Sequence, residues 1–385
     1  MKKQLSFADW IISQNISEDD PLRKIFSSVD FSFIENLVPE KSVGRKGFSP
    51  VSLFKALLLI PLGEARSQRE LAHRLRFDGR LCYLCGFTYG QTPSHNTFTV
   101  FKKRVGERKF KVILERLISQ TLCLIKENKV SAVIDSTSIK THFASDRDAR
   151  WGVKPESKEC SFFFGYKLHT SVIHGRLPVP VSFEVTPGSA YDGNFFKKLL
   201  SETSKKIKVK NAIADAGYDT LDNISYSKKR KIQPYIRANP RNSKNSLTSS
   251  KLTITPEGEV FCPGGKKLIY WGKEKRRKRF KFRCPLFKEN DTCLFKESCW
   301  KGKYGRSFYI SEFHTLSQEM KLFRTTKRFK KIYKKRQCVE RFFSLLKERF
   351  SLEHKLKVRE MENVKIYVYI VLSAYVASLF ARGFG

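Results

Sequence analysis

Acidic residues are scarce in this chain of 385 residues. It contains 37 Asp and Glu against 75 Lys and Arg, which gives a formal net charge of +38 and an isoelectric point near 9.9. Such an excess of one sign repels itself unless a polyanion is close, and the usual polyanion is nucleic acid. The basic residues are spread along the chain rather than confined to one amphipathic helix, so a membrane surface is the weaker alternative.

Long apolar runs are missing as well. The longest uncharged apolar segment covers residues 366–381, and its 16 residues fall short of the roughly 20 that a membrane-spanning helix needs. We therefore predict a buried helix there. The opening MKKQLSFADW has no apolar stretch behind it, so no signal peptide is predicted. Nine cysteines, an odd number, then favour free thiols or metal ligands over disulfides.

The first third of the chain shows a helical pattern. With 41% hydrophobic residues and 32 Phe, the chain can bury a core and form two or three globular domains. FSPVSLFKALLL begins with Ser-Pro, a cap followed by a first-turn proline, and RSQRELAHRL opens a second helix after Gly63. PSHNTFTVFKKRVG predicts a further capped helix with a basic outer face. A plain helical domain is the alternative, but the net charge favours a DNA-binding domain with a helix-turn-helix-like pair.

Short β-rich runs bounded by Gly, Pro, Asn and Asp occupy the middle of the chain. They are VSAVIDSTSIKT, FFFGYKLHTSVI, PVPVSFEVTPG, NAIADAGYDT and IQPYIRANP. The first three are close enough in sequence for a meander, and a helix-like segment precedes each of the last two. This order predicts a mixed α/β sheet.

Two aspartates follow apolar runs in these strands. Asp135 follows Ala-Val-Ile and Asp215 follows Ala-Ile-Ala. A carboxylate that ends a buried strand lies at the edge of a sheet, where sites of α/β proteins form. Asp is also a common turn residue, so a single one would carry little weight. Two on neighbouring strands predict a site.

A third carboxylate lies in the basic stretch YKKRQCVERFFSLLKERF. On one continuous helix, four polar residues of this stretch share a sector of about 60°: Tyr333, Arg336, Glu340 and Lys347. Apolar residues point to the other side: Val339, Phe342, Leu345 and Leu346. The stretch therefore predicts an amphipathic helix whose polar face combines a carboxylate with cations.

Three converging carboxylates repel one another, and a divalent cation removes that penalty. Oxygen ligands suit Mg²⁺ or Mn²⁺, which take phosphate oxygens as further ligands. Two such ions about 3.5–4 Å apart activate a water or a 3′-hydroxyl and stabilise the leaving oxygen in phosphodiester attack. We expect Asp135, Asp215 and Glu340 to bind the metal ions for this reaction.

In the segments around these three carboxylates, the chain resembles the DDE transposases of bacterial insertion sequences, the group marked by a Tyr-x₂-Arg-x₃-Glu-x₆-Lys signature. Tyr333, Arg336, Glu340 and Lys347 meet the signature in full. VIDSTSIK and IADAGYD match the two Asp blocks, and GYKLHT with VTPGSAYDG matches the strands between them. GRKGFSPVSLFKALLL and PSHNTFTVFKKR resemble the helical DNA-binding domain of that family. The resemblance covers most of the chain.

The resemblance implies a role for each matched residue. Asp135, Asp215 and Glu340 would be the catalytic metal ligands of a ribonuclease H-like core. Arg336 and Lys347 would contact phosphates of the transposon end, and Tyr333 would position its terminal nucleotides.

The resemblance also implies an organisation and a function. We expect a helical DNA-binding domain at 1–120, the first part of the core at 121–250, a basic Cys-containing insertion at 251–305, and the rest of the core at 306–385. The protein would cleave terminal inverted repeats and join them to target DNA, as a homodimer on double-stranded DNA in the cytoplasm of a prokaryote, at the nucleoid. A catalytically inactive DNA-binding protein and a metal-dependent nuclease on the same core are the alternatives.

The insertion between Asp215 and Glu340 departs from the family pattern. It holds four cysteines that could bind a structural Zn²⁺: Cys262, Cys284, Cys293 and Cys299. Free thiols are the alternative, since the spacing lacks tight C-x₂-C pairs.

Smaller candidates have ordinary structural explanations. Cys82 and Cys85 have C-x₂-C spacing but no partner pair, so we expect them to pack in a helical core. His169 is expected to be a structural histidine, and Asp192 a turn residue rather than an accessory acid.

Overall fold

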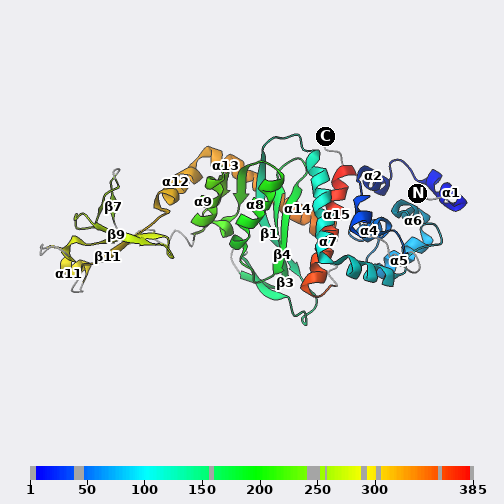
Figure 1. The fold of residues 1–385 in the computed structure, drawn as a ribbon, viewed down its shortest axis with the longest axis horizontal. Coiled ribbons are helices and arrows are strands. Elements are labelled where there is room, and N and C mark those ends of the chain that lie inside the picture. Colours follow the sequence, from blue (N-terminus) through cyan, green and yellow to red (C-terminus); the bar gives the residue numbers. More distant parts are fainter. Residues whose placement is uncertain are drawn as a thin grey trace. The chain divides into compact units, whose positions relative to one another are not determined.

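The computed structural model describes residues 6–38, 47–155, 160–240, 252–255, 258–287, 293–300, 305–353 and 358–381. The chain divides into two units. The first unit comprises Met1–Ala214, Lys231–Pro234 and Lys334–Gly385, and the second comprises Asp215–Arg230 and Tyr235–Tyr333. Figure 1 colours the elements along the sequence.

Seven helices of the described residues open the first unit, and Figure 1 labels most of them. They are α1 (Phe7–Asn15), α2 (Pro21–Ser28), α3 (Phe33–Leu37), α4 (Pro50–Leu58), α5 (Gln68–Phe77), α6 (Gly79–Cys85) and α7 (His95–Cys123). The predicted starts are confirmed: Ser49 caps α4 with Pro50 in the first turn, and the Ser67 hydroxyl accepts the Glu70 N–H at the start of α5. Both α4 and α5 pack against α6 and α7.

The helix predicted from PSHNTFTVFKKRVG does not end at Gly106. α7 continues to Cys123 with a kink at Gly106, where φ is 71° and ψ is 164°. Glycine takes this conformation without the steric cost that a side chain adds, so the chain changes direction there and resumes its helix. Ser94 stands at the N-cap position but makes no side-chain cap hydrogen bond.

A six-stranded mixed sheet forms the core that follows (Figure 1). Its strands are β1 (Val130–Lys140), β2 (Arg150–Pro155), β3 (Cys160–Ile173), β4 (Val179–Pro187), β5 (Val209–Ala214) and β6 (Gln233–Ile236). The order is β2-β3-β1-β5-β6, with β4 also paired to β3. β3 is antiparallel to β1, β2 and β4, whereas β5 is parallel to β1. The predicted mixed sheet and meander are confirmed, and β2 is an additional edge strand.

The two faces of the sheet carry different helices. α8 (Phe196–Lys206) packs on one face, where the Ser182 hydroxyl of β4 donates to the Leu199 carbonyl oxygen at 2.9 Å. The opposite face carries α15 (Met361–Ala381), because Phe183, the next residue of β4, contacts Tyr369 with ring centroids 5.3 Å apart. α14 (Gln337–Glu348) packs against β1.

The apolar segment near the C-terminus forms the helix α15. Its 21 residues are long and apolar enough to cross a membrane by length and composition, but 78% of that window is buried inside the protein. α15 packs against α2, α4, α7 and β4. The predicted buried helix is confirmed, although it begins at Met361 rather than near residue 366.

The second unit contains α9 (Leu221–Lys229) and the insertion. The insertion forms the strands β7 (Thr253–Ile254), β8 (Val260–Phe261), β9 (Ile269–Glu274), β10 (Arg279–Arg283) and β11 (Ser307–Ser311), with the short helix α11 (Lys296–Cys299). β9, β10 and β11 make one antiparallel sheet and β7 pairs with β8. α12 (His314–Thr325) and α13 (Lys327–Tyr333) follow. A helical N-terminal region, a mixed-sheet core and an insertion confirm the predicted ribonuclease H-like fold class.

Gly165 of β3 lies where the backbone of β1 leaves no room for a side chain. Its φ is 151°, and a Cβ built there would lie 2.2 Å from the carbonyl oxygen of Ile139. We expect Gly165→Ala to lower the free energy of unfolding by about 1–3 kcal/mol, through backbone strain and this clash. Gly175→Ala is the control, since its Cβ would meet nothing closer than 3.4 Å. Equal urea midpoints for the two variants would contradict the prediction.

Candidate active site

Asp135 lies within β1, not at its end as the sequence suggested. β1 continues to Lys140 because its second half still pairs with β3, in which Thr170 is the partner of Asp135. The parallel pairing with β5, however, stops at Ile134↔Ala214. Asp135 therefore stands where β1 loses its parallel neighbour.

Asp215 ends its strand as predicted. β5 stops at Ala214, and Asp215 caps the short 3₁₀ turn η2 (Ala216–Tyr218) by accepting the Gly217 N–H at 2.8 Å. It is also the first residue of the second unit.

The stretch 333–350 is not one helix, which corrects the angular prediction. α13 ends at Tyr333, a 3₁₀ turn η4 spans Lys334–Arg336, and α14 begins at Gln337. A 3₁₀ turn has about three residues per turn instead of about 3.6, so the rotation assumed for a continuous α-helix does not hold across it. Tyr333 belongs to the second unit, where its ring stacks on Phe329 with centroids 5.6 Å apart. Only Glu340 and Lys347 share α14.

Arg336 bridges two of the predicted carboxylates. Its Nη2 donates to Asp135 Oδ2 at 3.0 Å, and its Nη1 donates to Glu340 Oε1. The other oxygen of Asp135 accepts the Ser136 N–H at 2.9 Å. The Asp135 side chain is 12% exposed and that of Glu340 is 54% exposed. Two acids 205 positions apart in the sequence thus share one guanidinium in the first unit.

The apolar face of α14 holds this arrangement in place. Three of the four predicted inward side chains are buried: Val339, Phe342 and Leu346. The fourth, Leu345, is only half-buried. Phe342 packs edge-on against Tyr375 of α15 with centroids 5.0 Å apart. The Tyr375 hydroxyl donates to the Pro178 carbonyl oxygen at 2.7 Å, so α14 and α15 are tied to the sheet.

Lys347 forms an ion pair within the protein. Its Nζ lies 2.7 Å from Glu353 Oε2, and both side chains are mostly buried. A contact between Lys347 and DNA would therefore have to replace this pair.

Asp219, which the sequence reasoning missed, organises part of the second unit. It is buried, pairs with Arg324 of α12 and accepts the Asn239 N–H at 2.8 Å. Arg324 also donates to the Ile236 carbonyl oxygen at 2.9 Å. The only sequence signal was its place in IADAGYD, the second-Asp block.

His169 lies on the face of the sheet opposite Asp135. Successive strand residues point to opposite faces, and Asp135 is paired with Thr170. The His169 ring stacks on Phe195, and its Nε2 lies 2.9 Å from the Thr186 hydroxyl. Burial lowers the pKa of His169 to about 4, so the ring is neutral near pH 7. Its Nδ1 lies 3.6 Å from Asp192 Oδ1 and is buried without a hydrogen-bond partner among the described residues, so the structural role stays a prediction.

Other candidates have structural partners too. Asp192 accepts a hydrogen bond from Lys167 Nζ at 3.0 Å at the start of a 3₁₀ turn. Cys82 and Cys85 are buried in α6, as predicted. In the part of the chain that the structure describes, no group of three or more His, Cys, Asp or Glu side chains is gathered as a metal ion would require.

The N-terminal helices form a basic cleft with the start of α15. Five cationic side chains line it, with Glu360 as its one acid: Arg66, Arg69, Lys102, Lys103 and Arg359. Burial lowers the pKa of Lys102 below the usual lysine value. Among the described residues, no carboxylate pairs with Arg69, Lys102 or Lys103. A bound anion would restore the charge that burial disfavours.

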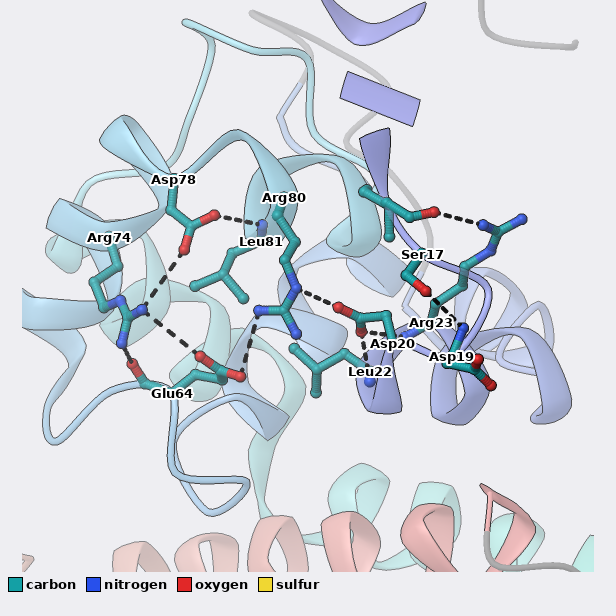
Figure 2. Close-up of polar contacts among 11 residues, drawn as sticks. Ser17, Asp19, Asp20, Leu22, Arg23, Glu64, Arg74, Asp78, Arg80 and Leu81 are labelled. Atoms are coloured by element: carbon teal, nitrogen blue, oxygen red, sulfur yellow. Dashed lines mark hydrogen bonds and ion pairs between the residues drawn. The ribbon is translucent and has the colours of Figure 1, made fainter. Parts of the chain in front are cut away.

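An ion-pair network fixes the helices beside this cleft (Figure 2). Arg80 of α6 pairs with Asp20, the N-cap of α2, and with Glu64. Arg74 of α5 reaches Glu64 and Asp78 at 3.7 and 3.6 Å. The hydrogen bond to Asp20 raises the pKa of Arg80 further, so Arg80 stays charged at any ordinary pH.

Comparison with known proteins agrees with this architecture. Residues 128–377 match the family described as Transposase DDE domain, and residues 11–104 match the one described as Transposase domain (DUF772). No curated protein matches the chain. Since the first match covers more than half of the sequence, the chain belongs to the DDE transposases of insertion sequences. It is therefore a DNA-processing enzyme of a family that binds DNA and generally uses divalent metals.

The Arg336 bridge can be tested by double-mutant cycles. We expect a coupling of about 1.5–3 kcal/mol between Asp135→Asn and Arg336→Gln, because this charge-assisted hydrogen bond is nearly buried. The coupling between Glu340→Gln and Arg336→Gln should be at most about 1 kcal/mol, because Glu340 is exposed. Urea unfolding of the five variants and the parent gives both values. A larger coupling to Glu340 would contradict the bridge as described.

Proposed function

We propose that this transposase binds the terminal inverted repeats of its own element, hydrolyses the phosphodiester at each end and joins the ends to target DNA. The observation that carries the proposal is the convergence of Asp135 and Glu340 on one guanidinium, within a chain of the DDE family. Carboxylates that converge in the core of a DNA-processing enzyme are candidates for metal ligands.

Asp135, Asp215 and Glu340 would hold two Mg²⁺ or Mn²⁺ ions. Two of these acids already share one cation, and an oxygen-only donor set fits hard divalent ions. Asp215 would join them because it follows Ala214, the partner of the residue before Asp135. When bound, the metals would polarise the attacking oxygen and stabilise the leaving one.

Arg336 would act as a counter-ion that is exchanged during the reaction. In the free protein its guanidinium offsets the repulsion between Asp135 and Glu340. When DNA binds, Arg336 would hydrogen-bond to a phosphate instead of to Asp135 and Glu340. The new charge-assisted bonds would replace the ones that Arg336 loses. Lys347 would likewise exchange Glu353 for a phosphate, and Tyr333 would stack on a terminal nucleotide.

Both chemical steps balance without an energy-rich cofactor. In the first, a water oxygen bonds to phosphorus, the bond from phosphorus to the 3′-oxygen breaks, and a 3′-hydroxyl is released. In the second, that hydroxyl attacks a target phosphodiester and displaces the target's own 3′-hydroxyl. The number of phosphodiester bonds is conserved in the second step.

The helical region before β1 would supply most of the DNA contacts. The basic cleft of Arg66, Arg69, Lys102, Lys103 and Arg359 is an electrostatic footprint of the kind that phosphate binding needs. Two ends must be held together for coordinated cutting, so we propose a homodimer on DNA. Its place would be the cytoplasm of a prokaryote, at the nucleoid.

Glu340→Gln tests the catalytic assignment. We expect metal-dependent nicking of end DNA to fall by more than about 100-fold, since even partners that merely orient metal ligands are worth 10–100-fold. DNA binding should be unchanged. Glu348→Gln is the control, because Glu348 lies on the same helix and contacts only Ser344 among the described residues. Nicking by Glu340→Gln at the parental rate would remove Glu340 from the site.

The product distribution separates the alternatives. Joined products from a pre-nicked end and a target plasmid would support a transposase. Nicking without joining would favour the nuclease, and binding without nicking would favour the inactive DNA-binding protein.

Arg66→Gln/Arg69→Gln/Lys103→Gln tests the cleft. Each lost phosphate contact lowers the slope of log K against log salt by about 0.9. We expect the slope for end DNA to fall by about 2–3 in fluorescence anisotropy titrations at several salt concentrations. Lys205→Gln/Lys208→Gln/Lys210→Gln makes the same charge change on exposed residues outside the cleft. Equal slopes for the two triple variants would show that the cleft does not contact DNA.

A further inference from the structure

The insertion sheet has little apolar core of its own. Its buried cluster in the described residues consists of four side chains: Val260, Leu268, Phe308 and Ile310. Several large apolar side chains of the same region are exposed: Tyr270, Trp271, Leu294, Phe295 and Trp300. Small units with so few buried residues usually need a disulfide or a metal to be stable. The cysteines described here are free thiols, so a bound metal is one of the remaining ways to stabilise this unit.

Two of the four cysteines of the insertion contact this cluster. Cys262 and Cys299 pack directly against it. Phe295, between Cys293 and Cys299 in the chain, covers Gly264, so that a Cβ at Gly264 would lie 3.0 Å from the Phe295 ring and 3.8 Å from Cys262 Sγ. The segment that carries the last two cysteines therefore lies on the turn that carries the first.

Two of the cysteines begin Cys-Pro turns. In Cys262-Pro-Gly-Gly, the Gly265 N–H donates to the Cys262 carbonyl oxygen at 2.9 Å and Gly265 takes a φ of 75°. In Cys284-Pro-Leu-Phe, the residues Pro285–Phe287 form the 3₁₀ turn η3. Both cysteines therefore lie at the start of a tight turn.

Cys284 lies beside the start of β11, the strand that carries Phe308 of the cluster, because its N–H donates to the Arg306 carbonyl oxygen at 3.1 Å. Adjacent thiolates would repel, and a bound dication removes that penalty.

We propose that Cys262, Cys284, Cys293 and Cys299 bind one structural zinc ion. Four thiolates satisfy tetrahedral zinc, whose sulfur distances are about 2.3 Å. The described sulfurs are neighbours but are not gathered at ligand distance. Binding therefore draws the two Cys-Pro turns and α11 inward over the cluster, and this closure secures the sheet of β9, β10 and β11.

Metal analysis of the full-length protein tests this inference. We expect one zinc per chain after purification, and less than a tenth of that in Cys284→Ser and in Cys299→Ser. Cys123→Ser is the control, because Cys123 is an exposed free thiol at the end of α7. Full zinc content in both Cys284→Ser and Cys299→Ser, or none in the parent protein, would overturn the proposal.

Cobalt and hydrogen exchange keep the test decisive if the serine variants do not fold. Co²⁺ added to metal-free parent protein should give the sulfur-to-cobalt charge-transfer bands and intense visible bands of a tetrahedral thiolate site. Chelation should increase amide exchange in β10 but not in β1. Absence of both changes would overturn the proposal. None of these readouts depends on transposition, so they stand apart from the proposed reaction.

Discussion

A guanidinium held between two carboxylates is the interaction on which the candidate active site depends. Asp135 is nearly buried, and a buried ionised carboxylate is costly unless it is paired and hydrogen-bonded. Arg336 and the Ser136 N–H meet that requirement. Because Glu340 is exposed, its ion pair with Arg336 contributes little stability.

The packing around this pair explains why it can be held accurately. α14 has one face buried against β1 and α15, and α15 is buried along most of its length against α7 and β4. Rigid elements fix a site better than loops do. The same helix α15 begins at the basic cleft, so a single element of the first unit contributes to both the sheet packing and the cationic surface.

Charged side chains are arranged differently in the ion-pair network of the N-terminal helices and in the basic cleft. Where Arg74 and Arg80 meet Asp20, Glu64 and Asp78, the acids are used to fix helices to one another (Figure 2). In the basic cleft the cations lack such partners among the described residues and are left for an external anion. With only 37 acidic residues, the chain can neutralise at most about half of its 75 cations, and the remaining charge of +38 favours DNA.

Local patterns in the sequence determined much of this protein: the capped helices α4 and α5, the buried α15, most strands of the mixed sheet, and the motif blocks that indicate a DDE transposase. Such features depend on residues close in the chain, whose spacing can be read directly. β2 was missed because RWGVKP becomes a strand only through its pairing with β3. Likewise, tertiary structure alone decided that Asp135 lies inside β1, that the signature helix breaks at Lys334–Arg336, and that Arg336 joins Asp135 to Glu340. Each of these depends on contacts between residues distant in sequence, which no local spacing encodes.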